Sequence, residues 1–107
     1  MLRKIYSVYD QAVEAYAAPV ALASDAQARR AFVDHVMKDE NIAKFPQDFA
    51  IYYVGEFDDS AGVFKPMDIP KMILSGQEAI RIVRTHITQD LVEQETLEED
   101  QLQEKQA

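Results

Sequence analysis

The stretch FAIYYVGEFDDSAGVF, residues 49–64, decides the fold of this chain. Its first six residues are all apolar or aromatic, which is typical of a central β-strand that is covered on both faces. Three carboxylates then follow within four positions: Glu56, Asp58 and Asp59. The Ser-Ala-Gly run after them suits a hairpin loop, because Asp and Ser bond the local backbone and Gly accepts a positive φ. The stretch therefore predicts a central strand, a tight turn and a return strand.

An acidic cluster of this kind has a metal site as its alternative interpretation. A calcium-binding loop needs acidic side chains that alternate over about a dozen residues and a closing Glu. Here the acids stop at Asp59 and are followed by small residues. The sequence therefore favours the turn over the metal site.

Sequence features of catalysis are sparse. The chain has no cysteine, and its two histidines, His35 and His86, lie far apart. It contains no phosphate-binding loop, dinucleotide-binding glycine motif, nucleophile elbow or zinc-protease motif. We therefore expect that the protein is not an enzyme and that it uses no cofactor and no metal.

Charge is distributed unevenly along the 107 residues, whose net charge is −8. Residues 1–88 hold ten Lys or Arg and twelve Asp or Glu, whereas residues 89–107 hold one Lys and seven Asp or Glu. We predict a single domain at residues 1–84 and an acidic tail at 85–107, which forms a frayed helix or is disordered. No apolar run is long enough to cross a bilayer, so we expect no membrane contact.

The hydrophobic pattern predicts an α+β fold of the type ββαββ, an antiparallel sheet with one main helix packed on it. Residues 10–18 are expected to form a broad turn, and residues 69–83 an irregular turn followed by a short helix or strand. The return strand contains Pro66, which marks it as an edge strand. Strands are expected at residues 2–9, 19–23, 49–57 and 63–67.

The main helix is expected at residues 25–38. Ser24 is a suitable N-cap, and Gln27 completes a capping box. Helical spacing predicts the face that packs on the sheet, which contains Ala28, Ala31, Phe32, His35 and Val36.

Strict alternation along the central strand would divide its side chains between two faces. One face would hold Phe49, Ile51, Tyr53, Gly55 and Phe57. The other would hold Ala50, Tyr52, Val54 and Glu56. Since both faces are largely apolar, we expect the helix on one side and a further element, a ligand or a second copy on the other. A homodimer through this second face of the central strand is therefore predicted.

Aromatic and basic residues alternate along several of these elements. Proteins that bind single-stranded nucleic acid combine a basic surface with rings that stack on bases. The alternative is that the rings belong to the core and that the basic residues form an ordinary solvated surface. The predicted nucleic-acid interface comprises Arg3, Lys4, Tyr6, Tyr9, Arg29, Arg30, Tyr52, Lys65 and Lys71.

Three segments resemble a known family when they are taken together. They are KIYSVYD at 4–10, SDAQARRAF at 24–32 and KFPQDFAIYYVGEFDDSAG at 44–62. In order and spacing, residues 2–83 are similar to the nonstructural proteins of Microviridae, the small single-stranded-DNA phages, and in particular to the gokushovirus-like branch. The shared stretch is distinctive but contains no catalytic motif.

The resemblance implies a phage nonstructural protein that acts in the cytoplasm of the host bacterium and is not part of the mature virion. Such proteins are described as DNA-binding or replication-associated. We therefore expect a DNA-binding accessory factor in replication or packaging of the single-stranded genome, with single-stranded DNA as its partner. The alternative is an adaptor that binds phage or host replication proteins without touching DNA. The acidic tail favours the adaptor, because it would repel DNA or compete with DNA for a basic patch.

Overall fold

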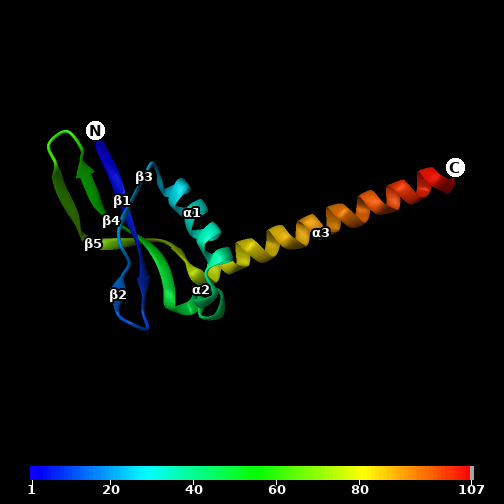
Figure 1. The fold of residues 1–107 in the computed structure, drawn as a ribbon, viewed down its shortest axis with the longest axis horizontal. Coiled ribbons are helices and arrows are strands. Elements are labelled where there is room, and N and C mark those ends of the chain that lie inside the picture. The colour runs from blue at the N-terminus through cyan, green and yellow to red at the C-terminus, as the bar shows by residue number, and fades with distance from the viewer. Residues whose placement is uncertain (107) are drawn as a thin grey trace.

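A computed structural model describes the backbone of residues 1–106 and the side chains of residues 1–95. It confirms the α+β class, with an antiparallel sheet and helices in the predicted order (Figure 1). The sheet elements are β1 (Leu2–Asp10), β2 (Ala15–Tyr16), β3 (Val20–Leu22), β4 (Phe49–Asp58) and β5 (Val63–Ser75). The helices are α1 (Asp25–Lys38), α2 (Glu40–Lys44), the short 3-10 helix η1 (Pro46–Asp48) and α3 (Gly76–Gln106).

The sheet has the strand order β2-β1-β4-β5, and β3 also pairs with β1. All pairings are antiparallel. β4 therefore lies between β1 and β5, which confirms that it is a central strand. β5 pairs only with β4 within the described residues, as the proline in this strand predicts for an edge.

The main helix has the predicted bounds and cap. The Ser24 hydroxyl accepts a hydrogen bond from the backbone N–H of Gln27 at 3.1 Å, and the Gln27 side chain accepts one from the N–H of Ala23 at 2.6 Å. One face of α1 is buried, through Ala28, Phe32 and Val36. Ala31 and His35 belong to the predicted face but are exposed beside a groove.

The core lies between α1 and one face of the sheet. It contains Tyr6, Phe32, Val36, Ile42, Ile51, Ile73, Leu74 and Ala79. The first turn of α3 closes the core, since Ala79 is fully buried. Gly76 begins this helix, and a Cβ there would overlap the carbonyl oxygen of Pro46. The close approach of α3 to η1 therefore requires glycine.

The alternation predicted for the central strand is wrong beyond Tyr53. Tyr53 pairs with Tyr6 and Gly55 pairs with Ile5, so Val54 is an extra residue on β4. This bulge moves Gly55 and Phe57 to the opposite face from Tyr53. Glu56 joins the face of Tyr53, and the Tyr53 hydroxyl donates a hydrogen bond to Glu56 at 3.1 Å.

Three other segments differ from the predicted boundaries. The expected broad turn at 10–18 contains the short strand β2. The return strand continues past residue 67 to Ser75. Tyr53 of β4 pairs with Lys71 and Gly55 pairs with Pro66, so residues 67–70 of β5 have no partner on β4. The acidic tail, expected as a frayed helix or as disordered chain, is part of α3, which begins at Gly76 in the body, continues to Gln106 and projects away from the sheet (Figure 1).

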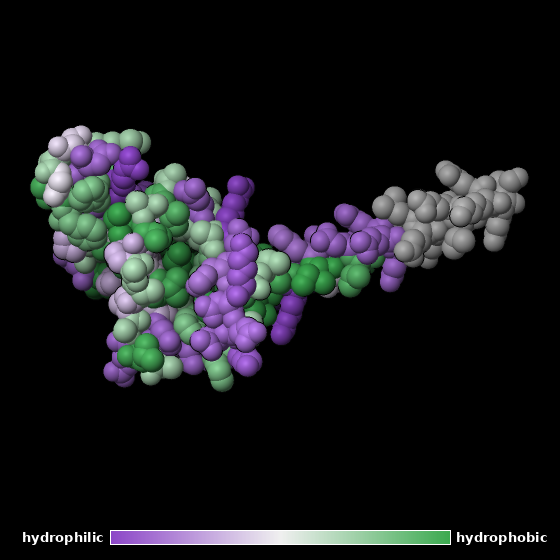
Figure 2. Space-filling model, in the orientation of Figure 1, coloured by the Kyte–Doolittle hydropathy of each residue, from purple (hydrophilic) through white to green (hydrophobic). Residues whose placement is uncertain are grey.

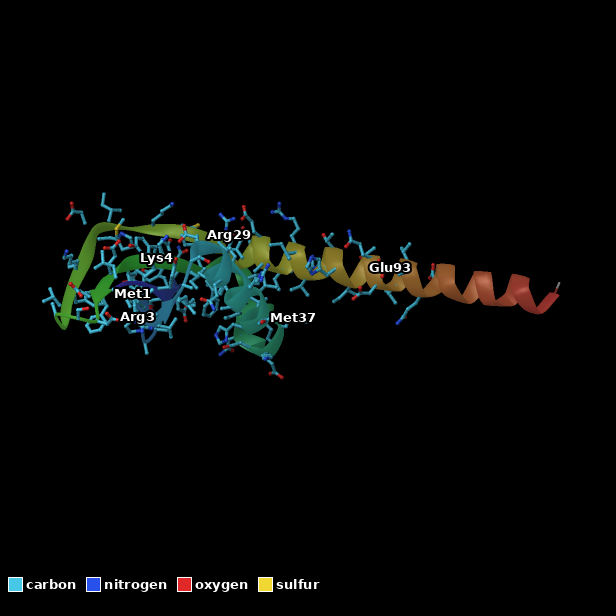
Figure 3. The ribbon with its side chains drawn as sticks, turned by 90° about the horizontal axis from the view of Figure 1, so that it is seen from above. Met1, Arg3, Lys4, Arg29, Met37 and Glu93 are labelled. Carbon is cyan, nitrogen blue, oxygen red and sulfur yellow. The ribbon has the colours of Figure 1, made fainter. Side chains whose placement is uncertain are left out.

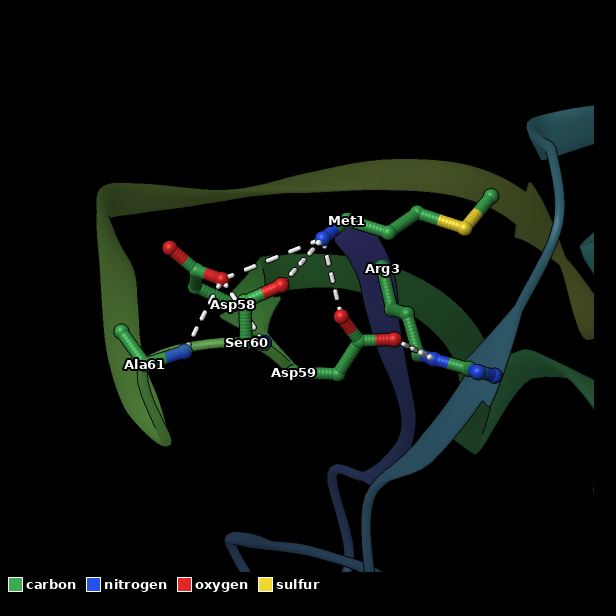
Figure 4. A network of polar contacts seen from close by, with 6 residues as sticks. All are labelled: Met1, Arg3, Asp58, Asp59, Ser60 and Ala61. Atoms are coloured by element: carbon green, nitrogen blue, oxygen red, sulfur yellow. Dashed lines mark hydrogen bonds and ion pairs between the residues drawn. The ribbon is translucent and has the colours of Figure 1, made fainter.

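The acidic cluster of the hairpin is a turn, as predicted (Figure 4). The Asp58 carboxylate accepts hydrogen bonds from the N–H groups of Ser60 and Ala61 at 3.0 and 3.3 Å. Gly62 has φ 69°, and its N–H bonds the Asp58 carbonyl at 2.8 Å. Within the described residues, no group of three His, Asp or Glu is placed to hold a metal ion.

Asp59 ties this turn to the start of the chain. Its carboxylate accepts hydrogen bonds from the Met1 ammonium and from Nε of Arg3, both at 2.9 Å (Figure 4). The ammonium first, and the guanidinium second, hold the pKa of Asp59 below its ordinary value. The start of β1 is therefore linked to the turn that follows β4.

Candidate nucleic-acid interface

Basic side chains gather around Asp25, the first residue of α1. The Asp25 carboxylate accepts a hydrogen bond from the Tyr6 hydroxyl at 2.6 Å. Its oxygens lie 3.9 Å from Nζ of Lys4 and 4.0 Å from Nζ of Lys71. Arg29, one helical turn later, also acts on the charge of Asp25. We call Lys4, Arg29 and Lys71 the basic cluster.

The hydrogen bond from Tyr6, helped by the basic cluster, keeps Asp25 ionised. This bond lowers the pKa of Asp25 most. Burial is the next largest effect and opposes it, and the charges of Lys4, Lys71 and Arg29 each lower the pKa by less. Three positive groups around one negative group leave a local positive surface on a chain whose net charge is −8. Such a surface can bind phosphate even when the whole molecule is acidic.

Lys65 extends this surface across the sheet. Lys4 is the register partner of Glu56 on β4, and Glu56 is the register partner of Lys65 on β5. Register partners share a face of the sheet, so the three side chains form one row. Glu56 lies between two lysines in this row, as Asp25 does in the basic cluster.

Tyr53 is the aromatic residue of this surface. Nζ of Lys4 lies 5.9 Å from the centre of the Tyr53 ring, and Lys71 is the register partner of Tyr53. Burial, together with the hydrogen bond to Glu56, raises the pKa of Tyr53, so its hydroxyl stays protonated. The half-buried Tyr53 ring therefore lies among the lysines that could hold a phosphate chain.

Two of the predicted basic residues lie outside both the basic cluster and its extension at Lys65. Arg3 precedes Lys4 on β1 and points to the other face of the sheet, where it pairs with Asp59. Arg30 is exposed on α1, on the side away from the buried Ala28 and Phe32. Lys4 and Arg29 are labelled in Figure 3, together with Arg3 near the end of the sheet.

Tyr6 was predicted to stack on bases, and its position contradicts that role. Its side chain is fully buried in the core, against Tyr53 at 5.5 Å between ring centres. Burial and the hydrogen bond to Asp25 raise its pKa strongly. The alternation of β1 predicted a ring near the basic residues, but α1 covers this ring. Its role is therefore to fix the start of α1 and, through Asp25, the basic cluster.

Tyr9 and Tyr52, the other two predicted stacking residues, lie on the opposite face of the sheet. They form a three-ring cluster with Tyr16, with ring centres 4.7 to 6.2 Å apart. Burial, with the neighbouring Tyr52 and Tyr9, raises the pKa of Tyr16. The predicted interface is therefore divided: lysines and Tyr53 share one face, and the tyrosine cluster occupies the other.

An apolar groove of about 750 Å³ opens between β1, the segment that follows it and α1. Its lining is mostly aliphatic, including Val13, Val20 and Phe32. Its acidic lining residues are Asp10 and Asp39, and Nε2 of His35, which also lines the groove, lies 3.7 Å from the Asp39 carboxylate. Such a lining suits apolar side chains and disfavours phosphate.

The predicted interface left out Asp25 and Tyr53, which the structure places among its basic residues. The sequence placed Asp25 only at the start of the main helix, which was expected at residues 25–38. The sequence did offer a signal for Tyr53, because it is an aromatic residue on the central strand, next to the predicted stacking residue Tyr52. The bulge at Val54 brings Glu56 to the same face, and its signal in the sequence is Gly55, because a glycine inside a strand often marks a bulge.

Residues 3–79 match the family described as Phage ORF5 protein. The chain belongs to this family. Membership confirms that it is a phage protein, and the matched residues include the sheet from residue 3 onward, α1 and the first turn of α3. The Phage ORF5 description states no activity, so the role of the protein must be argued from its surfaces. No curated protein and no solved structure matches the chain.

Among the described residues of this Phage ORF5 protein, no helix combines the length and the apolar content that crossing a membrane requires.

Proposed function

We propose that this Phage ORF5 protein is a nonstructural accessory factor that contacts single-stranded DNA during replication or packaging of a phage genome. The proposal places it in the cytoplasm of the infected bacterium and outside the mature virion, and its phage among the gokushovirus-like Microviridae. The resemblance of residues 2–83 to nonstructural proteins of these phages supports this assignment.

The observation that carries the proposal is the convergence of Lys4, Arg29 and Lys71 at the start of α1. These residues come from three elements that are distant in the sequence, and Lys65 and Tyr53 extend the surface. Phosphate contacts with Lys and Arg supply most of the affinity of sequence-independent DNA binding. Tyr53 would supply a ring edge or face for a neighbouring base.

The test is fluorescence anisotropy of labelled single-stranded and double-stranded DNA with the full chain, over a salt series. The triple variant K4Q/R29Q/K71Q is expected to lose most of the affinity for single-stranded DNA. Its salt dependence should also flatten, by a slope of about 0.7 for each phosphate contact removed. Circular dichroism would check that the variant remains folded.

The matched control is R30Q/K38Q/K44Q, which removes the same charge from exposed positions outside the basic cluster. Equal losses in the two triple variants would mean that net charge alone determines binding and would overturn the site. Absence of binding by the unmodified chain at about 50 mM salt, where electrostatic contacts are strong, would overturn the DNA role.

A second candidate function is the protein adaptor, which the exposed apolar surfaces favour. Val13 and Val20 on the rim of the groove are 67% and 51% exposed. Capture of the tagged chain from infected cells, with and without nuclease, separates the two functions. A stoichiometric replication protein that survives nuclease treatment would support the adaptor, and its absence would count against it.

A further inference from the structure

The projecting part of α3 exposes an apolar stripe. Every described side chain from Arg84 to Glu95 is exposed. Ile80, Val83, Ile87 and Leu91 follow one another at intervals of three, four and four residues, which keeps them on one side of a helix. Figure 2 shows this apolar band along one edge of α3, with hydrophilic residues along the other edge.

The apolar stripe is partly covered near the body and fully uncovered farther along α3. Ile80 and Val83 are half-buried against the body, whereas Ile87 and Leu91 are 51% and 55% exposed. An isolated helix has only marginal stability in water, and helices in proteins depend mainly on packing of their apolar face. A helix that continues beyond the body with an apolar stripe therefore indicates that something packs on it.

The charges of α3 identify the occupant. The helix segment next to the body carries Arg81 and Arg84 against Glu78, and the segment after it carries Asp90, Glu93 and Glu95. Glu93 lies well clear of the body in Figure 3. A second copy aligned in parallel would set like charges side by side, which is unfavourable. A second copy aligned antiparallel would set the basic segment of each helix beside the acidic segment of the other.

We infer that α3 pairs antiparallel with α3 of a second copy of this chain. A register that sets Ile87 against Leu91 of the second copy also places Arg84 beside Glu95 of the second copy, and symmetry repeats both contacts. This surface is distinct from the second face of β4, which was predicted for a dimer and now carries the tyrosine cluster. The inference is independent of the proposed DNA contact.

Sedimentation equilibrium of the full chain tests the pairing. The unmodified chain is expected to show twice the mass of one chain, and I87D/L91D the mass of one. The control T85D/Q89D adds the same charge on the opposite side of α3 and should keep the doubled mass. A single-chain mass for the unmodified protein at high micromolar concentration, or a doubled mass for I87D/L91D, would overturn the inference.

Cross-linking tests the direction, because the chain has no cysteine of its own. A mixture of R84C and E95C chains should form a disulfide-linked dimer under mild oxidation, whereas R84C alone should not. In a parallel pair, R84C alone would cross-link and the mixture would not be preferred. That outcome would reject the antiparallel arrangement.

Discussion

Tyrosines on the two faces of the sheet differ in burial and in the partners of their side chains. On the face covered by α1, Tyr6 is fully buried and its hydroxyl bonds the ionised Asp25. On the other face, Tyr16 is 45% exposed and contacts mainly the rings of Tyr9 and Tyr52. A buried tyrosine needs a partner for its hydroxyl. The comparison teaches that strand register sets which tyrosine faces α1, and that Asp25 satisfies the hydroxyl of the one that is buried.

The largest expected effect is a difference in stability between removing an aromatic ring on the α1 side of the sheet and removing one on the other side. Phe32→Ala should lower the free energy of unfolding by about 3–5 kcal/mol, because it leaves a cavity between α1 and the sheet. Tyr16→Ala removes a half-exposed ring, so we expect a loss of about 1 kcal/mol. Urea unfolding followed by circular dichroism measures both, and equal losses would show that the second face is as tightly packed as the first.

A smaller effect concerns the hydroxyl groups themselves. Tyr6→Phe removes the 2.6 Å hydrogen bond to Asp25 and should cost about 2 kcal/mol, because the acceptor is charged. Tyr9→Phe is the matched control on the other face and should be close to neutral. The same unfolding measurement applies. A neutral Tyr6→Phe would mean that burial of the ring, rather than the hydrogen bond, holds Tyr6 in the core.

The smallest effect is a dependence of stability on pH. The folded-state pKa of Asp25 is lowered, so its carboxylate stabilises the fold above the unfolded-state pKa, and this contribution is lost as pH falls through the folded-state value. The difference in stability between the unmodified chain and Asp25→Asn should therefore be constant from neutral pH to about pH 5 and shrink below about pH 4. Unfolding curves at several pH values would measure it. A constant difference down to pH 2 would contradict the assignment of the shift to Asp25.

Local sequence signals predicted much of the fold. The capping pair Ser24 and Gln27 located the start of α1, and the Asp-Asp-Ser-Ala-Gly run located the hairpin. These signals work because their interactions are formed by neighbours in the chain. The helical end of the chain was less predictable, since sparse apolar residues and many charges also suit a disordered tail.

The candidate site was only partly predictable. Lys4, Arg29 and Lys71 were named, but their convergence depends on pairing across β1, β4 and β5 and on the docking of α1. The bulge at Val54 changes which side chains share a face, and Gly55 marks its place in the strand without fixing which residue is extra. The burial of Tyr6 depends on the docking of α1, whose first residue, Asp25, lies 19 positions away and accepts the hydrogen bond of its hydroxyl.

The close approach of Gly76 to Pro46 affects the direction in which α3 leaves the body, and the length of the helix amplifies any change in that direction. The helix has 31 residues and is therefore about 45 Å long at 1.5 Å per residue. A change of ten degrees at its base would displace its far end by about 8 Å. The close fit of Gly76 against the carbonyl oxygen of Pro46 thus helps to set where the distant acidic end of the molecule can reach, and a Cβ at position 76 would force this contact to change.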